Sequence, residues 1–275
     1  MATRQLLNPN LDRAKLAQDF RQTGMIVIDQ IMKPEEAEKI HTFLKNMPDE
    51  VDKPWWNWAR WTQDSGARLI YTKPAFKADA DAARQQAYIR RSQGKYSYSF
   101  KRTAEDHFDR CNCQLCLFKA WLAGPEFMTF IEEITGFQYD LINLFANKYQ
   151  AGDYLDRHTD KVGPRSLTYV FNMTKNWREE YGGLLLMIEQ GRYYAPGFNK
   201  LVLFDLPPGG RLHCVTEVAQ NVTEVRLGLT GWYQNKQFPG KPEASDTDEE
   251  NTIDYEPDED ESDESISDTD EVEKY

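Results

Sequence analysis

Two histidines and an aspartate have the types and the spacing of a metal site. His158 and Asp160 are separated by one residue, and His213 follows far downstream. In an extended segment, residues i and i+2 point to the same side, so His158 and Asp160 can converge on one ion. Two imidazoles and a carboxylate can occupy one face of Fe(II) and leave positions open for a chelating co-substrate and O2. The alternative for the bare His-x-Asp triplet is a surface turn.

An arginine further along the chain supports the metal interpretation. Arg226 opens the run Arg-Leu-Gly-Leu-Thr-Gly-Trp-Tyr, in which Arg226, Gly228 and Thr230 alternate with two leucines and a glycine. This is the period of a strand with two different faces. A buried arginine needs an anion, and its planar fork suits a carboxylate. We expect the carboxylate of a ligand there, with a structural salt bridge as the alternative.

Several short segments around these residues carry a resemblance to a known family. In chain order they are Asn147-Lys148-Tyr149-Gln150-Ala151-Gly152, Arg165-Ser166-Leu167-Thr168-Tyr169-Val170, Lys175-Asn176-Trp177, Glu180-Tyr181-Gly182-Gly183-Leu184 and Pro196-Gly197-Phe198-Asn199-Lys200-Leu201. The stretch 147–233 resembles the 2-oxoglutarate- and Fe(II)-dependent dioxygenases, nearest to the prolyl-hydroxylase branch with its hypoxia-type and ribosomal-protein enzymes. The segment 213–218, which leads to Arg226, resembles the ribosomal type in particular.

The resemblance implies a role for each of these positions. The two histidines and the aspartate would bind iron, and Arg226 would pair with the distal carboxylate of 2-oxoglutarate. Thr230 would lie nearby on the same strand face, and Tyr149 would line the co-substrate pocket. Asn172 is a departure, since hypoxia-type enzymes have a tyrosine there that hydrogen-bonds the distal carboxylate. An amide can still donate a hydrogen bond, but it reaches less far.

The second half of the chain reads as a succession of short strands separated by Gly and Pro turns. The expected strands are 138–149, 165–172, 183–189, 192–195, 200–205, 211–218 and 223–233. This pattern is typical of a sandwich or jelly roll. The resemblance implies a double-stranded β-helix with iron at its open mouth. The expected fold class is therefore mainly β with flanking helices.

We divide the chain into three parts. Residues 1–136 form a supporting and substrate-loop region, 137–238 the catalytic core, and 239–275 an acidic tail. In the first part we expect helices at 11–22 and 34–44, a strand at 24–29, a helical pattern at 115–122, and a helix between Gly124-Pro125 and Gly136.

Residues 54–103 are expected to be irregular and rich in aromatic side chains. Tryptophans at 55, 56, 58 and 61 are followed by tyrosines interleaved with arginines and lysines at 88–102. Such residues can line a substrate groove, cover a core, or stack on nucleic-acid bases. We favour a groove wall or packing over contact with nucleic acid.

Four further ligand-type side chains lie within ten residues: His107, Cys111, Cys113 and Cys116. Zinc could use them, but the Cys-x-Cys step is not the usual spacing of a paired knuckle. Ordinary reduced cysteines are the favoured interpretation, and a second metal site is the alternative.

The negative charge of the chain is concentrated at its end. Residues 246–275 contain sixteen Asp or Glu and one Lys, and subtracting their −15 from the whole-chain −12 leaves +3 for residues 1–245. So acidic a segment cannot bury enough apolar surface to fold. We expect a solubilising disordered tail, with contact to the basic 86–102 stretch or to a basic partner as the alternative.

Three features of the sequence indicate the cellular compartment in which the protein is expected. There is no run of about 18 apolar residues, the N-terminal residues lack a secretory pattern, and the four cysteines form no evenly spread framework. We expect a cytoplasmic or nuclear protein that does not enter a membrane.

The resemblance implies a hydroxylase that uses Fe(II), 2-oxoglutarate and O2, releases succinate and CO2, and is supported by ascorbate. Its expected substrate is a prolyl residue in a protein or peptide, such as a basic ribosomal or nucleic-acid-binding protein. A free amino acid or small metabolite is the first alternative. A nucleic-acid demethylase is disfavoured because Gly228 replaces the Asn of the demethylase pattern and no second Arg follows. A non-catalytic peptide-binding scaffold is the remaining alternative.

Overall fold

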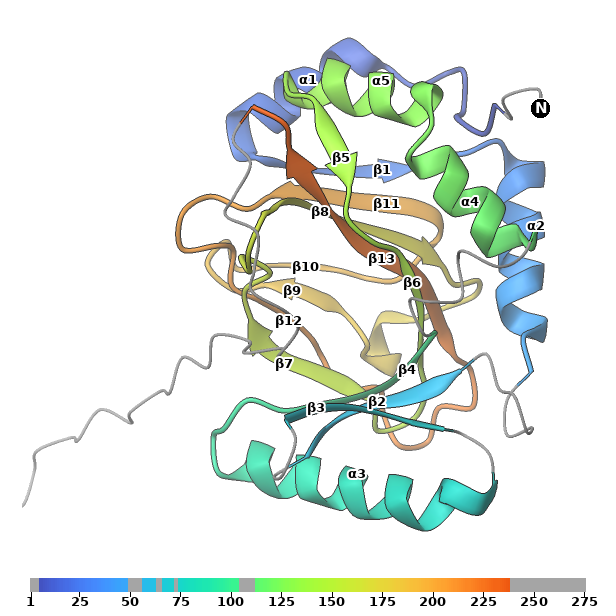
Figure 1. The fold of residues 1–275 in the computed structure, drawn as a ribbon, viewed down its shortest axis with the longest axis vertical. Coiled ribbons are helices and arrows are strands. Elements are labelled where there is room, and N and C mark those ends of the chain that lie inside the picture. Colours follow the sequence, from blue (N-terminus) through green and yellow to red (C-terminus); the bar gives the residue numbers. More distant parts are fainter. Residues whose placement is uncertain (1–4, 49–55, 63–65, 72–73, 104–111, 238–275) are drawn as a thin grey trace, which may run out of the picture.

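The computed structural model describes residues 5–48, 56–62, 66–71, 74–103 and 112–237 (Figure 1). Its helices are α1 (Arg13–Thr23), α2 (Pro34–Asn46), α3 (Lys77–Ser92), α4 (Gln114–Leu122) and α5 (Pro125–Thr135), with short 3-10 helices η1 (Pro74–Phe76) and η3 (Glu179–Tyr181). Its strands are β1 (Met25–Asp29), β2 (Asn57–Thr62), β3 (Gly66–Tyr71), β4 (Tyr98–Arg102), β5 (Tyr139–Leu141), β6 (Phe145–Tyr149), β7 (Tyr154–His158), β8 (Arg165–Met173), β9 (Leu185–Met187), β10 (Arg192–Tyr194), β11 (Phe198–Asp205), β12 (His213–Val215) and β13 (Arg226–Asn235).

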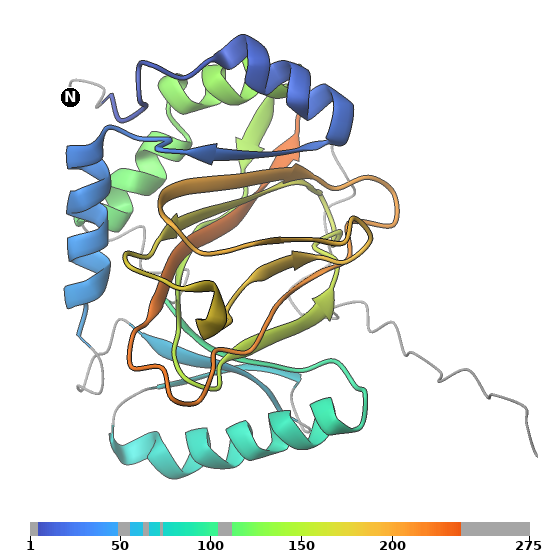
Figure 2. The same ribbon diagram turned by 180° about the vertical axis from the view of Figure 1, so that it is seen from behind.

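A curled antiparallel sheet forms the body of the protein (Figure 1). Its strands follow the order β1-β11-β8-β13-β6-β4-β7-β12-β9-β10, with β2 attached to β4, β3 to β2, and β5 to β13. The strands β7, β12, β9 and β10 curl over to face the others (Figure 2). This architecture confirms the expected fold class, mainly β with flanking helices. The domain boundary predicted at residue 137 remains a prediction. Strands β1 to β4 precede that boundary in the chain and belong to the same sheet as the later strands.

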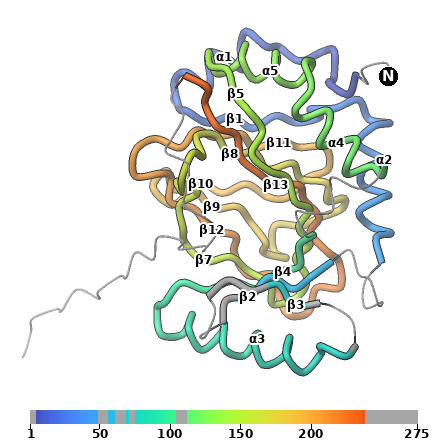
Figure 3. Tube along the Cα trace, in the orientation of Figure 1, coloured from blue at the N-terminus to red at the C-terminus, as the bar shows by residue number. Residues whose placement is uncertain are grey.

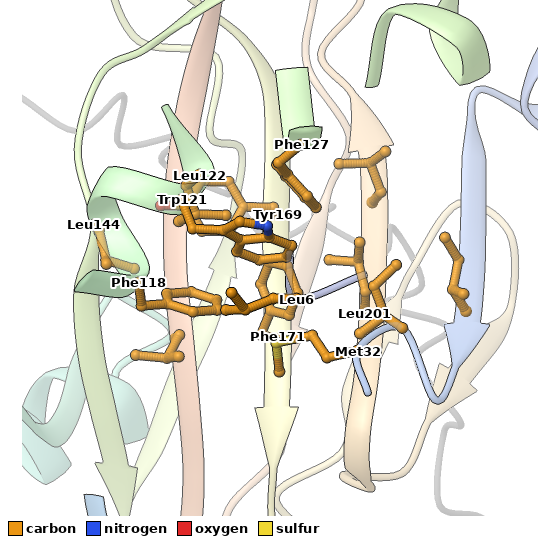
Figure 4. Packing of buried hydrophobic residues seen from close by; sticks show 14 of the residues in the cluster. Leu6, Met32, Phe118, Trp121, Leu122, Phe127, Leu144, Tyr169, Phe171 and Leu201 are labelled. Atoms are coloured by element: carbon orange, nitrogen blue, oxygen red, sulfur yellow. The ribbon is translucent and has the colours of Figure 1, made fainter. Parts of the chain in front are cut away.

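The helices α1, α2, α4 and α5 cover one face of the sheet (Figures 1 and 2). Their apolar side chains meet those of β8, β11 and β13 in a core that includes Phe118, Trp121, Phe127, Tyr169 and Phe171 (Figure 4). Leu227 and Leu229 belong to this core, whereas the alternate residues of β13 face the other way. The predicted two-faced strand is therefore confirmed.

Local signals explain where the N-terminal elements begin and end. Asp12 accepts a hydrogen bond from the backbone of Lys15 and caps α1, which stops at Gly24 with φ +66°. Pro34 opens α2, and Gly136, with φ +81°, ends α5. These are the start and stop signals of helices. The helices expected near 11–22, 34–44, 115–122 and 125–135 are confirmed, as is the strand near 24–29.

The expectation of an irregular segment at 54–103 was wrong. Strands β2 and β3 form a hairpin, β4 joins the sheet, and α3 packs beneath the hairpin (Figures 1 and 2). The helix forms because Ala80, Ala83 and Ala87 supply a small apolar stripe at helical spacing. Aromatic residues dominate the rest of the segment and obscured that stripe in the sequence.

Strand β7 was missed, and the strand expected at 138–149 is interrupted. Residues 142–144 separate β5 from β6. β7 reads Tyr-Leu-Asp-Arg-His, a charged sequence with weak strand character, and it is held by pairing with β4 and β12. Figure 3 shows its path beside β12. In the part of the chain described here, no helix is both long and apolar enough to cross a membrane.

Candidate active site

The structure brings His158, Asp160 and His213 together. His158 ends β7 and His213 begins β12, and the two are direct partners in the register of these strands. Asp160 follows just after β7, with Oδ1 3.4 Å from Nε2 of His158 and Oδ2 3.5 Å from Nε2 of His213. One donor atom from each residue lies within 4.8 Å of the other two. Ligand atoms that coordinate one metal ion at right angles to each other lie about 3 Å apart, so the spacing of this cluster fits a metal ion.

Backbone carbonyls orient both imidazoles. Nδ1 of His158 lies 2.9 Å from the carbonyl oxygen of Asp156, and Nδ1 of His213 lies 2.8 Å from that of Arg211. A carbonyl only accepts, so each Nδ1 must carry the proton and donate. Each Nε2 then keeps its lone pair and points at the cluster, as a metal-binding histidine requires.

The carboxylate of Asp160 is buried and held in its charged form. Burial alone would raise its pKa, but the imidazoles of His213 and His158 outweigh burial and hold the pKa of Asp160 well below its ordinary value. The hydroxyl of Thr168 on β8 donates to Oδ2 of Asp160 at 3.0 Å. This partner was not predicted from the sequence, although Thr168 lies in one of the segments that carry the resemblance.

Arg226 is a buried cation that lacks an anion. Its side chain is 3% exposed, its Nε and Nη1 have no hydrogen-bond partner, and no described carboxylate forms an ion pair with it. Burial lowers the pKa of its guanidinium, which lies over the ring of Tyr149 with Cζ 4.8 Å from the centroid. Two unsatisfied donors on a buried charge are costly unless a ligand completes them. These orphaned atoms fit the carboxylate of a 2-oxo diacid.

The other predicted co-substrate residues divide into two groups. Tyr149 and Thr230 line the same cavity as the metal cluster and Arg226. Asn172 is buried on the same side of β8 as the cavity-lining Thr168 and Val170, but it does not itself line the cavity. Asn147, which was not predicted as a site residue, lines the cavity and donates from Nδ2 to Oγ1 of Thr230 at 2.8 Å. Its only sequence signal was its place two residues before Tyr149.

Strand β4 and the hairpin supply part of the wall. Tyr96, Tyr98 and Phe100 line the cavity, with Leu69 of β3 beside them. Trp56, by contrast, is fully buried. The aromatic segment therefore serves both as groove wall and as packing. Trp55 lies outside the described residues, as do the side chains of Trp61 and Tyr71.

The second metal site predicted as an alternative cannot be placed as a whole. Sγ of Cys113 and Sγ of Cys116 lie 3.6 Å apart, while His107 and Cys111 lie outside the described residues. Within the described part of the chain, the cluster at His158 is the one group of metal-ligating residues. The acidic tail beyond residue 237 is also outside the described residues.

The sequence profile of the 2OG-Fe(II) oxygenase superfamily matches residues 144–234, which include all three cluster residues and Arg226. Residues 144–234 of this chain are therefore similar to the 2OG-Fe(II) oxygenase superfamily. Among proteins of that superfamily, the similarity extends to prolyl hydroxylases. The members depend on Fe(II), 2-oxoglutarate and O2, and the two histidines and aspartate fit the iron among these.

Two curated relatives carry the prolyl-hydroxylase likeness. The prolyl 3,4-dihydroxylase OGFOD1 of Ostreococcus tauri is 26% identical over 131 residues, which are 42% of this chain and 25% of that protein. The prolyl 3-hydroxylase OGFOD1 of Mus musculus is 24% identical over 131 residues, 44% of this chain and 24% of that protein. The match thus spans about a quarter of each relative's length.

Solved structures with the same fold extend over more of the chain. A 2OG-Fe(II) oxygenase family oxidoreductase of Burkholderia pseudomallei has a TM-score of 0.54 at 13% identity, covering 86% of this chain and 98% of that one. A prolyl hydroxylase of Trichoplax adhaerens, solved with a peptide fragment of hypoxia inducible factor, has a TM-score of 0.53 at 14% identity and covers 82% and 90%. These likenesses establish the jelly-roll fold.

Proposed function

We propose that the protein is an Fe(II)- and 2-oxoglutarate-dependent hydroxylase of prolyl residues in a protein or peptide. The observation that carries the proposal is the orphaned guanidinium of Arg226 in the same cavity as the histidine–aspartate cluster. A metal cluster alone would fit many functions. A buried arginine in the same cavity, with hydrogen-bond donors that have no partner, favours a co-substrate that carries a carboxylate.

Each residue of the site has a defined task. His158, Asp160 and His213 would hold Fe(II), and the carbonyls of Asp156 and Arg211 keep both imidazoles in the required tautomer. Arg226 would hold the distal carboxylate of 2-oxoglutarate, so that the oxo-acid end reaches the metal. When bound, Fe(II) and 2-oxoglutarate supply the oxidising chemistry that turns a C–H bond into C–OH, with release of succinate and CO2.

Asp160 also bears on the type of reaction. A carboxylate ligand fills the position that a halogenase of this superfamily needs for halide. Hydroxylation is therefore favoured over halogenation. Ascorbate is proposed only as a supporting reductant.

The substrate is inferred from relatives and from the shape of the site. Both curated relatives are prolyl hydroxylases by name, and the Trichoplax adhaerens enzyme was solved with a peptide. Tyr96, Tyr98 and Leu69 line part of the cavity and offer apolar surfaces on which a proline ring can pack. We further propose that the protein acts in the cytoplasm or nucleus, on a basic substrate such as a ribosomal or nucleic-acid-binding protein.

A free amino acid is the second candidate substrate, because the same cavity could accept a small molecule. The test is incubation of the Fe(II)-loaded full chain with 2-oxoglutarate, O2 and a proteome extract, followed by mass spectrometry for the added mass of one oxygen atom. Hydroxyproline that is absent with His158→Ala supports the proposal. Succinate released only when an amino-acid pool replaces the extract would move the assignment to small-molecule hydroxylation.

A further inference from the structure

Asn172, Gly228 and Asn147 form one row across three adjacent strands of the site. Gly228 of β13 pairs with Asn172 of β8 on one side and with Asn147 of β6 on the other. Directly paired residues of antiparallel strands lie on the same side of a sheet, and so do Arg226 and Thr230, two residues away along β13. Gly228 therefore leaves a position without a side chain between the two asparagines on this side of the sheet.

The amide of Asn147 reaches across this bare position. A Cβ on Gly228 would lie only 2.7 Å from Oδ1 of Asn147. That oxygen is buried and has no hydrogen-bond partner, while Nδ2 donates to the hydroxyl of Thr230. A hydroxyl both donates and accepts, so a half-turn of the amide keeps its bond to Thr230 and presents the NH2 group where the oxygen lies. Asn147 can therefore donate to an anion above Gly228.

Asn172 is placed less favourably for this role. It is also buried, and its Oδ1 also lacks a partner. It does not line the cavity, however, whereas Asn147 lines it together with Arg226 and Thr230. Alignment with hypoxia-type enzymes selects Asn172 because it follows sequence position. The strand register places both asparagines beside Gly228, but the lining of the cavity and the close approach to Gly228 select Asn147.

We propose that Asn147, rather than Asn172, is the neutral donor that binds the distal carboxylate of 2-oxoglutarate beside Arg226. This inference rests on the proposed function. The carboxylate lies over Gly228, where a side chain at that position would exclude it, and accepts from the open donors of Arg226 and from the amide. Thr230 is a positioning residue, because its hydroxyl fixes the amide of Asn147.

The burial of these groups explains why a second donor matters. A carboxylate has about four lone-pair sites, and one guanidinium fork cannot satisfy all of them. Arg226 and Asn147 are both buried, and a carboxylate oxygen left unsatisfied beside buried groups weakens binding. The Asn147 amide supplies the missing hydrogen bond from the side of β6.

The test is the dissociation constant of 2-oxoglutarate for the full chain loaded with Fe(II) in the absence of O2. It is measured by titration calorimetry and by the visible charge-transfer absorption that a chelated 2-oxo acid gives with Fe(II). Asn147→Ala should raise the constant roughly tenfold or more, the effect expected for a hydrogen bond to a charged group. Asn147→Asp, which has the same shape but places a carboxylate against a carboxylate, should raise it further. Thr230→Val should have a smaller effect in the same direction.

Asn172→Ala is the matched control and should leave the constant within about threefold of the wild-type value, a change of under 1 kcal/mol. Wild-type affinity in both Asn147 variants would overturn the inference, as would a larger loss in Asn172→Ala than in Asn147→Ala. Since Asn147→Asp is nearly isosteric, it keeps the test valid if Asn147→Ala does not fold. Failure of the wild-type chain itself to bind 2-oxoglutarate would overturn the proposed function, and the inference with it.

Discussion

The guanidinium of Arg226 lies over the ring of Tyr149, and the two residues are direct partners on the adjacent strands β13 and β6. The ring face attracts the cation and covers it on one side. A cation–π contact at a desolvated site contributes about 2 kcal/mol, less than the loss of hydration of a buried charge. Folding therefore leaves Arg226 short of an anion, and a ligand carboxylate relieves this deficit.

Replacing Arg226 should raise the stability of the ligand-free protein and at the same time weaken binding of the co-substrate. Arg226→Met removes the buried charge, so without ligand its free energy of unfolding should exceed that of the wild type by about 1–3 kcal/mol. Saturating 2-oxoglutarate stabilises a binding protein by about 2.7 kcal/mol at a hundred times the dissociation constant. It should do so for the metal-loaded wild type and not for the variant. Urea unfolding with and without 2-oxoglutarate measures both effects; a variant that is less stable yet still stabilised by the ligand would contradict this account.

Loss of a metal ligand should abolish metal binding and spare the fold. His213→Ala removes one of three donors, so addition of Co(II) to this variant should not give the absorption bands that it gives with the wild type. His41→Ala is the matched control, because His41 lies on α2 and its Nδ1 meets the carbonyl oxygen of Met173 outside the cavity. Equal Co(II) spectra for His213→Ala and His41→Ala would refute the ligand assignment.

Thr168 should affect the metal through Asp160. Thr168→Val keeps the shape of the side chain and removes the hydroxyl that donates to Oδ2 of Asp160. Loss of such a supporting hydrogen bond typically lowers metal affinity about 10–100-fold. Competition with a chelator gives the affinity. Thr135→Val, which removes a buried hydroxyl in α5 that donates to the backbone carbonyl of Ile131, should leave the affinity unchanged.

A buried carboxyl away from the metal should make stability depend on pH. Burial raises the pKa of Asp153 from 3.8 to about 6, although Gln150, Arg60 and Ser99 favour its charged form. Because the folded state binds the proton more tightly than the unfolded chain does, this group stabilises the fold at low pH. That contribution falls as pH rises from about 4 to about 6, by up to about 3 kcal/mol.

The Asp153→Asn variant isolates this contribution. The free energy of unfolding of the wild type, minus that of the variant, should fall by about 2–3 kcal/mol between pH 4 and 6.5. Denaturant unfolding at several pH values provides both curves. If the curves run parallel across this range, Asp153 does not titrate as described.

The clustering of the candidate site residues was easier to predict from the sequence than the elements that carry them. His158, Asp160 and Arg226 are chemically specific and occur in an order that few alternatives explain. The alternation after Arg226 also predicted a strand with two different faces, because a strand has a period of two, and the structure places one face of β13 in the core and the other at the cavity.

Other features depend on pairing that no local pattern reveals. β7 has a charged sequence and is a strand only because β4 and β12 flank it. Helix α3 relies on small alanines within an aromatic segment. The position of Asn147 in the same cavity as Arg226 depends on which strand lies beside β13, a long-range property of the sheet. Sequence alignment therefore selected Asn172, which lies on the other neighbour.

The most direct measurement of the central claim follows oxygen from isotopically heavy O2 into the product. The Fe(II)-loaded chain is incubated with 2-oxoglutarate, heavy O2 and a proteome extract, and protein hydroxyproline and succinate are analysed by mass spectrometry. We predict that heavy oxygen enters both products, and that neither is labelled with His213→Ala. Labelled succinate without any labelled hydroxyproline would contradict the prolyl assignment, and the absence of label from both would contradict the dioxygenase function itself.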